Sequence, residues 1–164
     1  MKKHLIYLCA CVCAIILSGC SEFNLNNFVE PCTTWGADTQ EVLNEMTANG
    51  FKQDGVAETL SGSIIRYHYR SKKNNEITTY CDFQKLKLVA SGVYFNKSTT
   101  GVSFSELRAF LAERYGMPQS EGGDFSQNTS YEFFYSKDAR TVILLEQTTY
   151  KNVAANHVQY TENK

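Results

Sequence analysis

Apolar residues recur at helical spacing in one well-marked stretch of the chain. They fall at the three- and four-residue intervals of an amphipathic helix: Leu107, Phe110, Leu111 and Tyr115. Ser103 and Glu106 form a capping box just before this stripe, and Gly116 follows it as a stop. The pattern therefore predicts a helix that begins after Ser103 and ends before Gly116.

An earlier stretch follows the same plan. Asp38 stands as the cap, Glu41 follows at the third position, and Asn49-Gly50 ends the helix. Residues 36–42 and 101–107 both read Gly, apolar, cap, two free positions, Glu, apolar. Either the chain holds two divergent copies of a helix-plus-hairpins unit, or both segments simply show what any well-capped helix start requires.

Alternation of apolar and polar residues predicts strands elsewhere. In residues 64–70, Ile65, Tyr67 and Tyr69 occupy one face, whereas Arg66, His68 and Arg70 occupy the other. Similar segments cover 77–83, 86–95, 131–135, 141–148 and 153–160, with a weaker signal in 51–60. Short turns between neighbours imply antiparallel pairing. We therefore predict an α+β fold in which two helices pack on one face of an antiparallel sheet of about six to seven strands.

The first twenty residues differ from the rest of the chain. Lys2 and Lys3 precede an uncharged run over 5–17, which is too short to cross a bilayer but is typical of a secretory signal. The alternative is an uncleaved amphipathic or core helix. The sequence Leu17-Ser18-Gly19-Cys20 resembles the lipobox of bacterial lipoproteins.

That resemblance implies cleavage before Cys20, attachment of diacylglycerol to its thiol, and acylation of the new amino terminus. The protein would then be anchored in the cell envelope, and Ser21 after the cysteine favours the outer membrane. We accordingly divide the chain into a signal peptide (1–19), a lipidated cysteine with a polar tether (20–31) and one α+β domain (32–164).

If Cys20 carries lipid, Cys32 and Cys81 are the remaining cysteines of the mature chain. In an oxidising compartment such a pair is typical of a disulfide. The bond would close a loop of about 50 residues and contribute roughly 3–4 kcal/mol in the chain-entropy model. The alternative is two unpaired buried thiols.

Composition narrows the function. A formal net charge of −1 argues against a broad nucleic-acid-binding face. The chain shows no Gly-x-Ser-x-Gly elbow, no metal-ligand spacing and no phosphate loop. We expect His68 on a solvated strand face and His157 at a frayed or edge position near the chain end, so neither favours catalysis. The sequence therefore predicts a non-enzymatic protein without metal or cofactor.

Two groups of side chains are candidates for binding. Arg66, His68 and Arg70, followed by Lys72 and Lys73, concentrate positive charge that suits anionic lipid or an acidic partner. Tyr131 and Tyr135 share a strand face with Phe133 and would expose rings for binding. The alternatives are a solvated sheet face for the cations and a core position for the rings.

The segment 101–118 (GVSFSELRAFLAERYGMP) resembles part of small outer-membrane lipoproteins of the SmpA/OmlA type, and also the repeats of β-lactamase-inhibitor-like domains. Both families place short helices on an antiparallel sheet and contact other proteins. We therefore expect a membrane-anchored lipoprotein that binds a macromolecule, most simply a protein partner in the envelope. A small-ligand or glycan binder is the alternative, and a hydrolase with a spatially assembled site is the third.

Overall fold

The computed structural model describes residues 23–72, 77–123 and 129–164. The predicted signal peptide and Cys20 therefore lie outside the described residues. Nine strands form one antiparallel sheet: β1 (Phe51–Gln53), β2 (Glu58–Leu60), β3 (Ile64–Ser71), β4 (Ile77–Gln84), β5 (Lys87–Asn96), β6 (Ser120–Gly122), β7 (Tyr131–Tyr135), β8 (Thr141–Tyr150) and β9 (Val153–Glu162). The helices are α2 (Thr39–Ala48), α3 (Lys97–Thr100) and α4 (Phe104–Tyr115), with the 3₁₀ turns η1 (Leu25–Asn27) and η2 (Ser61–Ser63).

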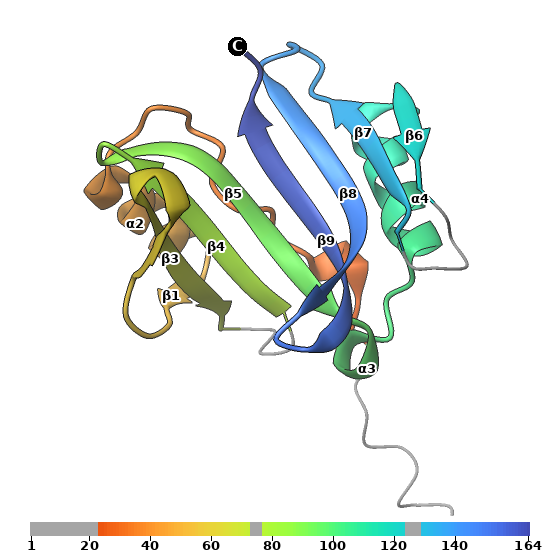
Figure 1. The fold of residues 1–164 in the computed structure, drawn as a ribbon, viewed down its shortest axis with the longest axis horizontal. Helices are drawn as coiled ribbons and strands as arrows, with labels where there is room; N and C mark the ends of the chain where they lie inside the picture. Colours follow the sequence, from red (N-terminus) through yellow and green to blue (C-terminus); the bar gives the residue numbers. More distant parts are fainter. Residues whose placement is uncertain (1–22, 73–76, 124–128) are drawn as a thin grey trace, which may run out of the picture.

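The order of strands across the sheet is symmetric about its centre. It runs β1-β3-β4-β5-β9-β8-β7-β6, with the short β2 paired to β3 (Figure 1). The first half comprises α2 and β1 to β5, and the second comprises α4 and β6 to β9. In each half a helix precedes strands that pair with their neighbours in the chain, and the last strands of the two halves, β5 and β9, pair with each other.

Both long helices begin as the capping boxes predicted. The Asp38 carboxylate accepts hydrogen bonds from the backbone N–H groups of Gln40 and Glu41, and the Glu41 carboxylate accepts from the Asp38 N–H. Ser103 and Glu106 make the corresponding reciprocal pair at α4. Each box satisfies N–H groups that have no partner within the helix, which fixes where the helix starts.

The predicted fold class is wrong in its proportions. The described residues form a β-rich fold of nine strands with three short helices, in place of two helices on a sheet of about six to seven strands. The additional strands β1, β2 and β6 have three residues each, and α3 has four. Elements of this length hold too few residues for an apolar period, so pairing with a neighbour defines them instead.

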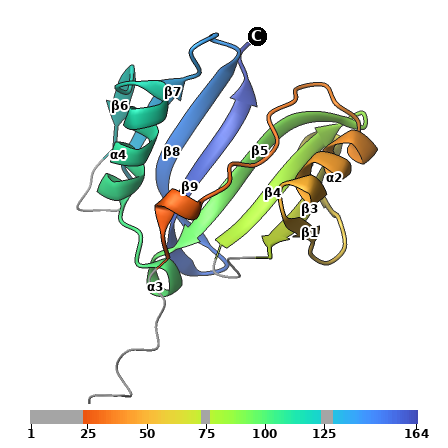
Figure 2. The same ribbon diagram turned by 180° about the vertical axis from the view of Figure 1, so that it is seen from behind.

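One face of the sheet carries the helices. Figure 2 shows α2, α4 and the segment that leads from Phe23 to α2 on this face, whereas Figure 1 shows the opposite face, which no helix of the described part covers. We call the latter the open face. Two core clusters lie under the helix layer, one between α4 and the second half and one between α2 and the first half.

Two aromatic residues of the predicted tether belong to the core. Phe23 and Phe28 are buried, and both rings pack edge-on against Phe95 with centroids 5.7 and 5.3 Å apart. Trp35 lies further along the same segment, contacts both clusters and donates from its indole N–H to Thr141 Oγ1 at 3.0 Å. The chain from Phe23 onward is therefore fixed to the domain.

Candidate functional site

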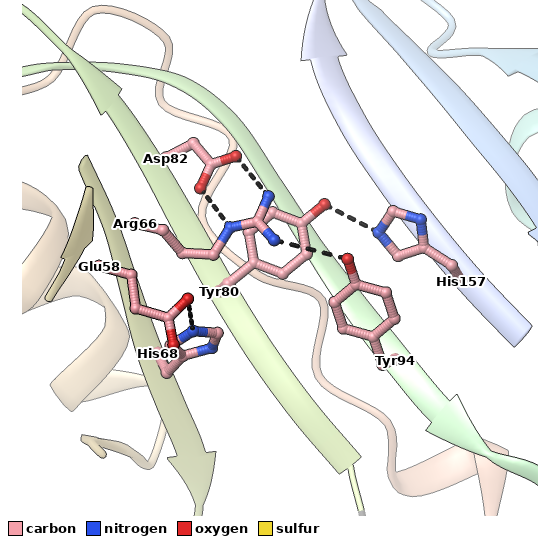
Figure 3. A network of polar contacts seen from close by, with 7 residues as sticks. All are labelled: Glu58, Arg66, His68, Tyr80, Asp82, Tyr94 and His157. Carbon is pink, nitrogen blue, oxygen red and sulfur yellow. Dashed lines mark hydrogen bonds and ion pairs between the residues drawn. The ribbon is translucent and has the colours of Figure 1, made fainter. Parts of the chain in front are cut away.

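An arginine–aspartate pair anchors a polar network on the open face of the first half (Figure 3). Arg66 donates through Nε to Asp82 Oδ1 and through Nη2 to Asp82 Oδ2, both at 2.7 Å. The two residues face each other across β3 and β4, so the pair is bidentate and its geometry is set by the strand register. Burial alone would lower the pKa of Arg66, but the Asp82 carboxylate outweighs it and raises that pKa.

Tyr80 extends the network toward the centre of the sheet. The Arg66 guanidinium carbon lies 3.7 Å from the centroid of its ring, and the ring passes over Gly92 of β5. The Tyr80 hydroxyl then lies 2.8 Å from Nε2 of His157 on β9. Glycine is required under this ring, since a Cβ at position 92 would lie 2.5 Å from the Tyr80 hydroxyl.

His157 completes a carboxylate–imidazole–phenol chain. Its Nδ1 lies 2.8 Å from Glu146 Oε1 on the neighbouring strand β8. Nδ1 therefore faces the carboxylate and Nε2 faces the phenol, so the ring joins the two groups by hydrogen bonds. Burial, chiefly, raises the pKa of Tyr80, which keeps the phenol protonated and able to donate.

Stacked rings close the network from the side. Tyr94 stacks on His157 and on Tyr150, with centroids 4.3 and 4.2 Å apart. Tyr80 has no exposed surface and His157 is buried. The groups of this network bond to one another, and Tyr94, Glu146 and Tyr150 at its border are half-buried. We assign the network a structural role, because it links five adjacent strands through side chains.

The basic side chains predicted from the sequence as a binding group differ in their exposure to solvent. Arg66 and His68, with side chains only 15% and 11% exposed, are largely buried, whereas Arg70 is exposed and pairs with Asp54 at 2.7 Å. The prediction that His68 lies on a solvated strand face is therefore wrong. The alternation itself is confirmed, because Tyr69 is buried under α2 on the opposite face.

The prediction of a frayed or edge position for His157 is also wrong. This residue lies in the buried middle of β9, a central strand, and not at a frayed end. Its position near the C-terminus does not indicate that β9 is a central strand. The strand is central because it pairs with β8 of its own half and with β5 of the other half. A usable signal was the apolar content of residues 153–160, which suits a central strand.

A polar groove of about 380 Å³ adjoins the network on the open face. It is lined by residues from the β1–β2 loop, β3 and the β8–β9 turn, including Asp54, Glu58, His68, Arg70, Tyr150 and Lys151. His68 Nε2 lies 3.3 Å from Glu58 Oε2. Within the described residues, by contrast, His68 Nδ1 and the Tyr150 hydroxyl make no hydrogen bond, although both atoms are shielded from solvent.

An apolar surface occupies the open face of the second half. It consists of Tyr131, Phe133 and Tyr135 from β7 with Val142 and Leu144 from β8, and we call it the aromatic surface. Tyr131 is 40% exposed, and the other four residues are half-buried. Glu132 and Phe134, between the three rings in sequence, are buried on the helix face, so the predicted sharing of one face by the rings is confirmed.

The two cysteines of the domain lie in one core cluster. Cys32 and Cys81 are both buried among the residues under α2, and both are free thiols in this structure. Burial raises the pKa of Cys32 to about 11, and burial, followed by the charge of a Cys32 thiolate, raises the pKa of Cys81 well above its ordinary value. Their disulfide stays a prediction, and their common cluster is compatible with it.

The described residues show neither a metal site nor a membrane-spanning helix. In residues 23–72, 77–123 and 129–164, no three acidic, histidine or cysteine side chains gather where they would hold a metal ion. No helix in these ranges has the length and apolar character needed to cross a bilayer.

Comparisons with known proteins leave the chain without a family. No family model and no curated protein sequence matches it. A solved cysteine-rich secretory protein from Staphylococcus aureus subsp. aureus Mu50 is 11% identical over 82% of this chain and 45% of that chain, with a TM-score of 0.35. Neither fold nor function is transferred at that level, and the lipoprotein resemblances stay predictions.

Proposed function

We propose that this chain is a lipid-anchored, non-enzymatic protein of the cell envelope, with the outer membrane as its destination, and that its domain binds a protein partner through the aromatic surface. The anchor is the lipobox-like cysteine Cys20. The observation that carries the binding role is the uncovered aromatic surface on β7 and β8.

The aromatic surface differs from the rest of the open face. In the first half, the open face is polar, and its central side chains Arg66, Asp82 and Tyr80 bond to one another or to His157. In the second half, three aromatic and two aliphatic side chains stay partly in contact with water. Apolar area of this kind favours association, and tyrosine supplies contact area at a small cost in side-chain entropy.

Anchoring is tested by removing the thiol. A Cys20→Ala variant expressed in the native host should lose incorporation of labelled fatty acid and appear in the soluble envelope fraction. A Cys32→Ala variant controls for the loss of a cysteine as such. Recovery of Cys20→Ala in the membrane fraction, with the same yield as the unaltered chain, would refute lipid anchoring.

Partner binding is tested by site-specific crosslinking in intact cells. A photoreactive amino acid at Tyr131 should give one discrete crosslinked protein, and Phe133→Ser in the same chain should abolish that product. The control position is Met117, which is 68% exposed and lies away from the aromatic surface in sequence and on no strand. Equal products from positions 131 and 117, or insensitivity to Phe133→Ser, would argue against the aromatic surface.

A second function, binding of a small hydroxylated ligand such as a glycan, is favoured by one observation. The groove beside β3 holds His68 Nδ1 and the Tyr150 hydroxyl, which lack hydrogen bonds within the described residues. Such groups are satisfied by a ligand that both donates and accepts. Soluble peptidoglycan fragments should then shift the His68 ring signals in NMR spectra and should not do so in a Tyr150→Phe variant. Unchanged signals at saturating fragment would exclude this ligand class.

A further inference from the structure

The distance available between the lipid and the folded domain is short. Cys20 precedes Phe23 by three residues, and Phe23 is already buried in the core. Three residues span at most about 10 Å when fully extended. If Cys20 is lipidated, as the proposed function states, the part of the domain nearest Phe23 must therefore lie at the membrane surface.

Phe23 lies at one particular end of the molecule. Its ring packs on Phe95, directly before Asn96, which caps α3. It also shares a surface hollow with Val102, which lies between α3 and α4, and with Glu106 in the first turn of α4. At this end β3, β5 and β8 finish, while β4 and β9 begin (Figure 1). We call it the anchor end.

Lysines are distributed around the anchor end. Lys72 follows β3, Lys97 opens α3, and Lys151 lies in the turn between β8 and β9. Lys72 and Lys151 are exposed, and Lys97 is half-buried. Of the carboxylates near this end, Asp54 is paired with Arg70, whereas Glu106 keeps its negative charge, because its capping partner Ser103 is neutral. The two exposed lysines, Lys72 and Lys151, outweigh the single charge of Glu106.

From the tether length and this charge we infer that the anchor end is a membrane-docking surface, which lies on anionic lipid headgroups through Lys72 and Lys151. Ammonium groups near a negatively charged leaflet are attracted over roughly a Debye length, about 8–10 Å, which is comparable to the reach of the tether. The strands then stand upright on the bilayer. The aromatic surface faces sideways, where a partner in the same envelope can reach it.

Lysine footprinting tests this orientation directly. A diacyl lipid is coupled chemically to Cys20 of the mature chain, and the protein is bound to phosphatidylcholine vesicles that contain phosphatidylserine. Acetylation of each lysine by an amine-reactive ester is then followed by mass spectrometry. The comparison is the same lipidated chain with a long Gly/Ser insert directly after Cys20, which frees the domain from the surface.

The short-tether protein should show several-fold slower acetylation of Lys72 and Lys151 than the protein with the insert. Lys85 and Lys137, exposed in turns at the opposite end of the strands, should react equally in both. Equal rates at Lys72 and Lys151, or protection of Lys85 and Lys137 instead, would overturn the proposed orientation. Because the lipid is attached in vitro, this result is independent of whether the native host acylates Cys20.

The attraction of the anchor-end lysines to anionic lipid is tested with protein that carries no lipid. Replacement of Lys72 or Lys151 by Gln should each lower partition of the unlipidated domain onto phosphatidylserine vesicles by about fivefold, the effect of one lysine at such a surface. The matched variants Lys85→Gln and Lys137→Gln should leave partition unchanged. Equal losses from both sets would show attraction by overall charge and would contradict a docking surface.

Discussion

The close approach of Tyr80 to Gly92 makes one backbone position decisive for the open-face network. A methyl group on Gly92 would have to displace a buried ring that Arg66 and His157 hold on its other sides. We expect Gly92→Ala to lower the free energy of unfolding by about 1–3 kcal/mol, as overpacking does. Urea unfolding of the purified domain measures this loss.

Ser91→Ala is the matched control in the same strand. Ser91 is buried, and within the described residues its hydroxyl has no hydrogen-bond partner. Its removal should therefore leave stability unchanged or raise it slightly. A Gly92→Ala variant as stable as Ser91→Ala would contradict the tight packing of Tyr80.

Burial also controls the chemistry of Cys32. Because its pKa is raised to about 11 in the folded, reduced protein, the thiolate is scarce at neutral pH. Alkylation by iodoacetamide at pH 8 should be far slower than in the unfolded chain, as mass spectrometry would show. The folded state holds this proton more tightly, so stability should fall as pH rises from about 9 toward 11.

Oxidised protein provides the complementary result. If Cys32 and Cys81 form the predicted disulfide, protein isolated from the native host should resist alkylation until it is both unfolded and reduced. Rapid alkylation after unfolding alone would show two free thiols and contradict the disulfide.

At the scale of elements, the capping box of α4 couples the start of the helix to the ionisation of Glu106. Hydrogen bonds from the Ser103 side chain and backbone N–H lower the pKa of Glu106. Ser103→Ala should therefore raise the Glu106 pKa toward its ordinary value, measurable by NMR titration, and should cost about 1 kcal/mol of stability. The contribution of the box is present at neutral pH and is lost as pH falls through the Glu106 pKa.

Ser103→Thr retains an N-cap hydroxyl and is the control. It should keep the Glu106 pKa low. An unchanged pKa in Ser103→Ala would mean that the backbone N–H alone lowers it.

These capping boxes mark the part of the fold that a sequence can predict. Asp38, Glu41, Ser103 and Glu106 act within one turn, so their spacing is visible in the chain. The long strands were equally visible through alternation. The short strands β1 and β2 gave only the weak signal over 51–60, and β6 and α3 gave none, because each of these elements is defined by pairing with another strand or by a single turn. The network around Tyr80 was hidden for the same reason: its residues come from separate strands and meet only through the register.

For the whole molecule, the segment before α2 acts as part of the domain. Phe28 is buried between Phe95 and Phe110, so Phe28→Ala should destabilise the protein by about 3–5 kcal/mol. The adjacent Val29 is 41% exposed, and Val29→Ala should have little effect. Thermal or urea unfolding distinguishes the two. Equal, small effects would mean that residues 23–31 are a free tether after all.

The position of Trp35 gives the protein a built-in optical probe. It is the chain's single tryptophan, and it contacts the cores of both halves while its indole bonds to Thr141. Its emission therefore reports the seam between the halves, whereas circular dichroism reports the strands themselves. Separate loss of the fluorescence signal, before the strands melt, would reveal that the two halves come apart as independent bodies.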